Sequence, residues 1–121
     1  MNVLIVDDSA LVRSYHRQIL ESGGFYVEEA ANGLEAYEKA LTKNYDLYIV
    51  DINMPVLDGY SFVQKLRDTK DLKQSPVIMV STEQENKDKD MAFRCGANFY
   101  IAKPVKSEEL LGFCKIISGV N

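Results

Sequence analysis

The chain contains 121 residues, of which 46% are hydrophobic, and this is typical of one globular domain with a single core. It has 14 basic and 18 acidic residues, and the net charge of −4 argues against a nucleic-acid-binding domain with a basic surface. No apolar stretch reaches the roughly 20 residues of a membrane span, and no signal peptide precedes the first apolar run, so we expect a cytoplasmic protein.

Short apolar runs alternate with helix-like segments along the whole chain. Four runs are strongly apolar, and a weaker one mixes apolar and acidic residues; in chain order the runs lie at residues 3–6, 25–29, 47–50, 77–80 and 99–102. Apolar runs that alternate with helices are typical of strands in a parallel sheet. We therefore expect residues 1–121 to form one α/β domain. The expected architecture is a three-layer, doubly wound sandwich: a five-stranded parallel sheet in the flavodoxin-like order 2-1-3-4-5, with five helices.

Five segments are predicted to be helical, at residues 10–22, 32–43, about 60–67, 84–95 and from 107 onward. Asn32 and Glu35 have the pattern of a capping box, and Ser107 is expected to cap the last helix. His16, the single histidine, is expected at the surface or its boundary. Cys95 and Cys114 lack the spacing of metal ligands, so we expect reduced, apolar fillers.

Polar residues stand at the carboxyl ends of the four strongly apolar runs. In chain order they are Asp7, Asp8, Asp51, Ser81, Thr82 and Lys103. The carboxyl ends of parallel strands meet along one edge of the sheet, and ligands bind there where the strand order reverses. Three carboxylates, one or two hydroxyls and one ammonium should therefore converge. Such a group of side chains suits a cation and a phosphoryl group.

The carboxylates of this group predict a magnesium site. Carboxylates held close together repel one another, and a divalent cation relieves that repulsion. Mg²⁺ prefers oxygen ligands and usually keeps several waters, so one or two carboxylates and a carbonyl suffice. We expect Asp8 and Asp51 to be side-chain ligands, with Asp7 beside them holding a water. The backbone carbonyl of Asn53 is expected to supply a further oxygen.

These residues carry a resemblance to a known family. The motifs Asp7-Asp8, Asp51-x-Asn53-Met54-Pro55, Asp58-Gly59, Ser81 and Lys103-Pro104 resemble the signature of two-component response regulator receiver domains across essentially the whole chain. Among receivers, the chain is most similar to the single-domain chemotaxis regulators. The resemblance implies that Asp51 accepts a phosphoryl group from a sensor histidine kinase. It also implies that Asp7 and Asp8 bind Mg²⁺ and that Ser81 and Lys103 hold the phosphoryl group.

The resemblance further implies a conformational switch. Ser81 would move toward the phosphate, and Tyr100 would turn inward and change the face formed by the fourth helix, the fifth strand and the fifth helix. A downstream protein would read this change. Asn53 and Glu83 would flank the water that hydrolyses the aspartyl phosphate. The protein would then be a phosphoacceptor switch and not an enzyme with a diffusible substrate. We expect a monomer before phosphorylation, and whether phosphorylation causes dimerisation stays open.

Some alternatives stay open at this point. The fourth helix begins with a highly charged stretch, residues 83–90, which leaves a flagellar-motor target in doubt. One alternative is a pseudo-receiver that only binds partners. Another is a receiver cut from a larger regulator. Met1 and Asn121 lie so close to the first strand and the last helix that we expect no output domain. A phosphatase of the haloacid dehalogenase type would instead need an Asp-x-Asp pair after the first strand and a cap domain.

Overall fold

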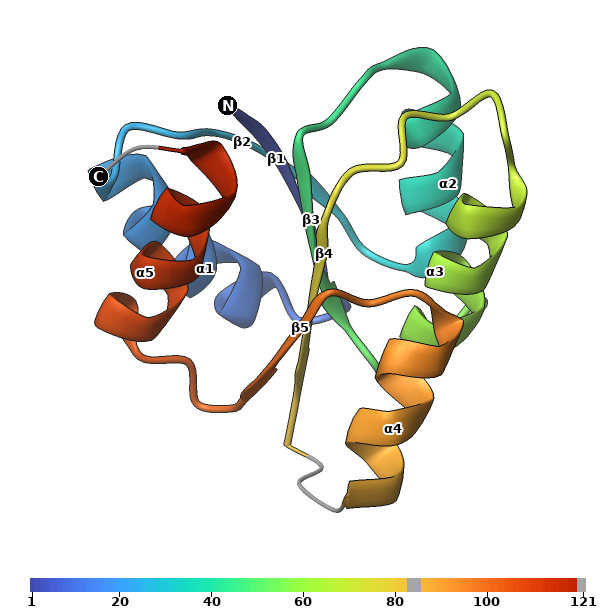
Figure 1. The fold of residues 1–121 in the computed structure, drawn as a ribbon. Coiled ribbons are helices and arrows are strands. Elements are labelled where there is room, and N and C mark those ends of the chain that lie inside the picture. Colours follow the sequence, from blue (N-terminus) through green and yellow to red (C-terminus); the bar gives the residue numbers. More distant parts are fainter. Residues whose placement is uncertain (83–85, 120–121) are drawn as a thin grey trace.

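The computed structural model describes residues 1–82 and 86–119, and strands alternate with helices along them (Figure 1). The strands are β1 (Asn2–Val6), β2 (Tyr26–Ala30), β3 (Leu47–Asp51), β4 (Val77–Ser81) and β5 (Phe99–Ala102). The helices are α1 (Ala10–Ser22), α2 (Gly33–Thr42), α3 (Gly59–Asp68), α4 (Asn86–Cys95) and α5 (Ser107–Ser118). Each element lies within a few residues of its predicted position.

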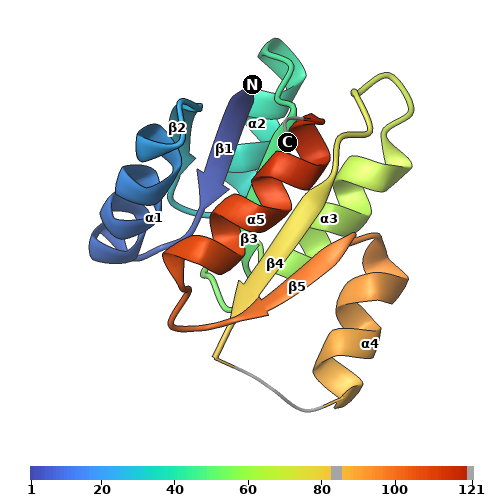
Figure 2. The same ribbon diagram turned by 60° about the vertical axis from the view of Figure 1, so that its left-hand side comes forward.

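The five strands form one parallel sheet in the order β2-β1-β3-β4-β5. Helices α1 and α5 cover one face of this sheet, and α2, α3 and α4 cover the other (Figures 1 and 2). The chain moves from β1 outward to β2 and then crosses to β3 on the other side of β1. The strand order therefore reverses between β1 and β3, which is where ligand sites form in such sheets. The predicted doubly wound fold is confirmed.

The core consists of two apolar clusters, one on each face of the sheet. Alternate residues of a strand enter opposite clusters: Val3 and Ile5 pack with α1 and α5, whereas Leu4 and Val6 pack with α2 and α3. The strands β3 and β4 are buried along their whole length. The weak apolar run proves to be the edge strand β2, which is only half-buried and begins at Tyr26, one residue later than predicted.

The inward face of α1 differs from the expectation for its histidine. His16, Ile19 and Leu20 are the buried residues of this helix, at the spacing of three and four that places side chains on one helical face. The expected surface or boundary position of His16 is therefore wrong, because the residue is 2% exposed. Burial lowers the pKa of the imidazole, and the Lys103 charge acts in the same sense, whereas Asp7 opposes it. Leu11, an apolar residue of the same helix, is 81% exposed.

One predicted helix cap is present, and the other is wrong. Asn32 Oδ1 accepts a hydrogen bond from the Glu35 N–H at 2.9 Å, and the Glu35 carboxylate accepts one from the Ala31 N–H at 3.2 Å, which gives a capping box shifted by one residue. The N-cap of α5 is Lys106, and it makes no side-chain capping bond. Ser107 is already the first helical residue, so its hydroxyl stands one position too late to act as the N-cap.

Both cysteines lie in the apolar core. Cys95 and Cys114 are both free and buried, and burial raises the pKa of both thiols, that of Cys114 to about 12. Within residues 1–82 and 86–119, no helix combines the length and the apolar character that crossing a bilayer requires.

The start of α3 depends on a glycine. A Cβ at Gly59 would lie 2.2 Å from the Asp51 carbonyl oxygen and 2.9 Å from the Ile52 Cα, so a side chain there would displace the backbone that follows β3. We expect Gly59→Ala to lower the free energy of unfolding, measured by urea denaturation, by about 1–3 kcal/mol.

Gly112 is the matched control, because a Cβ on this α5 residue meets no atom within 4 Å. Gly112→Ala should raise the free energy of unfolding by about 0.5–1 kcal/mol, since alanine loses less conformational entropy than glycine in a helix. Equal stabilities for Gly59→Ala and the wild type would show that the close contact is unimportant.

Candidate functional site

Three side chains from distant parts of the sequence meet at the carboxyl edge of the sheet. Lys103, just after β5, donates a hydrogen bond of 2.9 Å to Asp7 Oδ2 and another of 3.0 Å to Asp51 Oδ1. Lys103 is 96 residues from Asp7 and 52 residues from Asp51 along the chain. The parallel strands β1, β3 and β5 bring these residues together because all three strands end at this edge.

Asp8 completes a group of carboxylates. One carboxylate oxygen from each of Asp7, Asp8 and Asp51 lies within 4.8 Å of the other two. Asp7 and Asp51 are buried and Asp8 is exposed, so the group can be reached from solvent on the Asp8 side. An octahedral Mg²⁺ with bonds of about 2.1 Å needs ligand oxygens about 3–4 Å apart. The spacing of these hard oxygen donors therefore fits such an ion with small adjustments.

Burial and neighbouring charges shift the protonation equilibria of this site. Burial raises the pKa of Asp51, and although the Lys103 hydrogen bond opposes this shift, the charges of Asp7 and Asp8 add to it. Burial alone would lower the pKa of Lys103, but its hydrogen bonds to Asp7 and Asp51 outweigh burial and raise it. The shifts are consistent because one ammonium faces two carboxylates. Lys103 thus stays charged, and the carboxylates keep an excess of negative charge.

The turn between β1 and α1 holds Asp7 through several hydrogen bonds. Its N–H donates to the Ala30 carbonyl oxygen of β2 at 3.1 Å, and its Oδ1 accepts from the Ser9 N–H at 2.9 Å. Its carbonyl oxygen accepts from Arg13 Nη1 at 2.6 Å. Arg13 was not among the predicted site residues, and its only signal in the sequence is its place six residues after Asp7 on the first helix.

Ser81 lies on β4, the strand next to β3 and Asp51, and Tyr100 lies on β5, the edge strand beyond β4. Ser81 is the last residue of β4 and is buried, and its carbonyl oxygen accepts a hydrogen bond of 2.8 Å from the Lys103 N–H. In the sheet register Asp51 stands opposite Val80, so Ser81 follows that partner directly. Tyr100 is half-buried on the edge strand β5 and packs against the core cluster on the α4 side.

Two further candidates lie in the loops after β3 and β4. Asn53 is exposed and stands two residues after Asp51, where the chain leaves β3. Thr82, the second hydroxyl residue after β4, is exposed. Glu83 falls outside the described residues. The Lys103–Pro104 peptide bond is cis.

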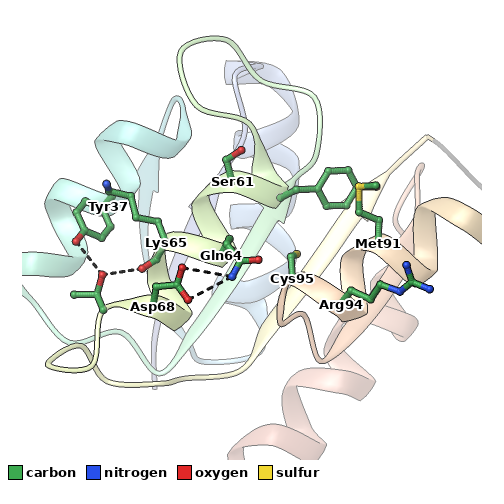
Figure 3. Close-up of a pocket in the computed structure, with 10 residues that line it drawn as sticks. Tyr37, Ser61, Gln64, Lys65, Asp68, Met91, Arg94 and Cys95 are labelled. Carbon is green, nitrogen blue, oxygen red and sulfur yellow. Dashed lines mark hydrogen bonds between the residues drawn. The ribbon is translucent and has the colours of Figure 1, made fainter.

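Two surface hollows are relevant here: one lies beside this site, and the other lies on the opposite face of the sheet. One of about 330 Å³ adjoins Lys103, where Tyr15 and His16 of α1 face the loop after β5, and the Tyr15 hydroxyl donates to the Val105 carbonyl oxygen at 2.9 Å. Another of about 730 Å³ lies on the opposite layer, among α2, α3 and α4 (Figure 3). There the Lys65 ammonium lies 4.7 Å from the centre of the Tyr37 ring. Among the described residues, the lining of this second hollow includes none of the carboxylates at the sheet edge.

The raised pKa of Asp51 predicts how stability depends on pH. The folded protein holds the Asp51 proton more tightly than the unfolded chain does, so this residue makes the free energy of unfolding fall as pH rises from the ordinary carboxyl pKa through the folded one. Asp51→Asn should therefore raise the free energy of unfolding of the metal-free protein at pH 7. This gain in stability should shrink as the pH falls toward the ordinary aspartate pKa of about 3.9. Urea denaturation in a chelator measures both; a variant less stable than the wild type at pH 7 would contradict this.

Comparisons with known proteins agree with this geometry. Residues 3–115 match the family model of the response regulator receiver domain. The transcriptional regulatory protein SrrA of Staphylococcus aureus is 38% identical over 109 residues, which are 90% of this chain and 44% of SrrA. The chain thus spans less than half the length of this relative.

Solved structures show the same fold in other settings. The chemotaxis protein CheY4 of Vibrio cholerae has 36% identity and a TM-score of 0.89, with 96% of this chain and 97% of that chain covered. The signal receiver domain of a signal transduction histidine kinase from Syntrophus aciditrophicus has 35% identity and a TM-score of 0.89, with 99% and 92% covered. Fold, site geometry and family model agree: the chain belongs to the response regulator receiver domain family of two-component signalling.

Proposed function

We propose that Asp51 accepts a phosphoryl group from a phosphohistidine of a sensor histidine kinase and that the protein then changes its affinity for a downstream protein. The observation that carries this proposal is the Lys103 ammonium, which lies 2.9 Å from Asp7 and 3.0 Å from Asp51 beside the exposed carboxylate of Asp8. Membership of the receiver family supports it, because this family consists of phosphoacceptor switches.

The proposed transfer is a substitution at phosphorus. An Asp51 carboxylate oxygen attacks the phosphorus atom and forms the new P–O bond of an acyl phosphate. The P–N bond of the donor breaks, and the imidazole nitrogen leaves with the electron pair. Such a transfer requires in-line placement and stabilisation of charge on the equatorial oxygens. Lys103 is already next to Asp51 and supplies a fixed positive charge for this purpose.

The carboxylate group is the proposed Mg²⁺ site. Asp7, Asp8 and Asp51 would hold the ion through their oxygens, and the Asn53 carbonyl would add another ligand. When bound, Mg²⁺ supplies positive charge that offsets the repulsion between the acceptor carboxylate and the phosphoryl oxygens. The excess of negative charge around Asp51 supports this proposal, because Lys103 alone does not balance three carboxylates.

For the output we propose the switch implied by the family. The Ser81 hydroxyl would donate to a phosphoryl oxygen, and Tyr100 would turn inward and reshape the surface of α4, β5 and α5. The position of Ser81, beside the strand partner of Asp51 and joined through its carbonyl to Lys103, supports this. For the reset we propose that Asn53 and Glu83 flank the attacking water, which would release the phosphate.

The downstream setting is proposed from the relatives. The likeness to the chemotaxis protein CheY4 over nearly all of both chains favours a chemotaxis-type regulator of one domain. The match to less than half of SrrA favours a second candidate, the receiver part of a transcriptional regulator. A receiver without phosphoryl chemistry is a third possibility, and the charged residues that meet around Asp51 argue against it.

Replacement of the proposed acceptor tests the reaction. Asp51→Asn should lose all labelling when the protein is treated with a small acyl phosphate and Mg²⁺, because an amide is a poor nucleophile, and intact-mass spectrometry measures this loss. Asp58→Asn is the control: Asp58 caps α3, an asparagine can still cap it, and labelling should be unchanged. Undiminished labelling of Asp51→Asn would remove the acceptor assignment.

The switch is tested separately from the chemistry. Tyr100→Ala should accept phosphate at a normal rate, but its capture of partners from a native lysate should no longer increase when the phosphoryl mimic beryllofluoride is added. Tyr26→Ala removes a tyrosine that is 75% exposed on the opposite edge of the sheet, and it should respond like the wild type. A mimic-dependent gain of partners by Tyr100→Ala would refute the switch role.

A further inference from the structure

Arg13 joins the acidic turn to the rest of the protein. Its Nη1 donates a hydrogen bond of 2.6 Å to the Asp7 carbonyl oxygen, and its Nε donates one of 2.8 Å to Glu29 Oε1 on β2. The Arg13 side chain is 17% exposed, so the protein encloses most of it. One side chain of α1 thus holds both β2 and the turn that carries Asp7 and Asp8.

We propose that Arg13 is a positioning residue that orients the peptide between Asp7 and Asp8 for cation binding, a role that rests on the proposed Mg²⁺ site. The Asp7 carbonyl and the Asp8 N–H belong to one planar peptide unit, so a hydrogen bond to that carbonyl fixes the direction in which the chain enters Asp8. The Asp8 side chain is exposed, and packing constrains it less than it constrains Asp7. Its carboxylate therefore depends on the backbone for its place.

The other polar groups of Asp7 are held independently of Arg13. Its N–H bonds to Ala30, its Oδ1 accepts from Ser9, and its Oδ2 accepts from Lys103. Arg13 supplies the bond to the remaining group, the carbonyl oxygen. Without Arg13 the two carboxylate bonds still hold the Asp7 side chain, but the peptide between Asp7 and Asp8 loses the hydrogen bond to its carbonyl oxygen. The effect should therefore fall on Asp8 and on the distance between the carboxylates.

Glu29 balances the charge that Arg13 brings close to the acidic group. Its second oxygen accepts a hydrogen bond of 2.7 Å from Arg17 Nε, and Arg17 also lies 3.4 Å from Glu21. Arg17 therefore shares the helix, the residue type and the Glu29 partner of Arg13, while its Nη1 is directed to Glu21. Arg17 is therefore the control: it has the same residue type, helix and Glu29 partner, but it makes no bond to the Asp7 carbonyl among the hydrogen bonds of the described residues.

The test compares Mg²⁺ affinity in Arg13→Ala and Arg17→Ala by isothermal titration of the full chain. We expect the Mg²⁺ dissociation constant to rise about tenfold in Arg13→Ala, as for other outer-shell residues of metal sites, and to change by less than about twofold in Arg17→Ala. The direction of the change separates two effects. Loss of a nearby positive charge would by itself lower the Mg²⁺ dissociation constant, whereas loss of the positioning bond should raise it. In the metal-free protein, the amide NMR shifts of Asp8 and Ser9 should change in Arg13→Ala and not in Arg17→Ala.

Several outcomes would overturn the proposal. Unchanged or tighter Mg²⁺ binding by Arg13→Ala would refute it, and equal weakening in both variants would show that the effect passes through Glu29. Arg13→Lys keeps the charge but cannot donate from two nitrogens of a planar fork, so it should weaken binding several-fold and serves if the alanine variant does not fold. A wild type that binds no Mg²⁺ would instead refute the metal site itself, and with it this role.

Discussion

The half-buried ammonium of Lys103 between Asp7 and Asp51 is the interaction on which the site depends. Two carboxylates taken out of water would repel each other strongly, and one cation that bonds to both makes their burial tolerable. With Asp8 included, three carboxylates face one ammonium and a net negative charge remains. That remainder favours the binding of a divalent cation, and it would repel any anionic group that came near Asp51.

The parallel sheet is what allows such a site to form from residues far apart in the sequence. All strands end at one edge, so short side chains that follow different strands become neighbours without long loops. Each charged group then takes its precise place from local contacts. Ser9 and Arg13 hold Asp7, the Ser81 carbonyl holds the Lys103 backbone, and Gly59 lets α3 begin against the chain that leaves Asp51. The fold brings the groups together, and these contacts set their orientation.

Strand positions and the meeting of Asp7, Asp51 and Lys103 could be predicted because they depend only on apolar runs and on the polarity of a parallel sheet. The orientation of a helix about its own axis and the exact residue at which a helix begins could not be predicted. His16 lies inward because of how α1 is turned against the sheet, and Ser107 fails as a cap because α5 begins one residue earlier than a cap would need. Arg13 was missed because its partner is a backbone carbonyl, which leaves no mark on the sequence.

The outer strand β2 is held to the helices by ion pairs as well as by apolar packing. Glu28 pairs with Lys43 near the end of α2, and Glu29 pairs with two arginines of α1, so opposite faces of this half-buried strand are tied to different helical layers by ion pairs. Mobile ions screen such pairs far more than they weaken the buried contacts of the central strands. High ionic strength should therefore loosen β2 first. Because the Asp7 N–H is bonded to the last residue of β2, Ala30, that loosening would reach the acidic turn. Salt would then act on the proposed cation binding through the backbone as well as by direct competition.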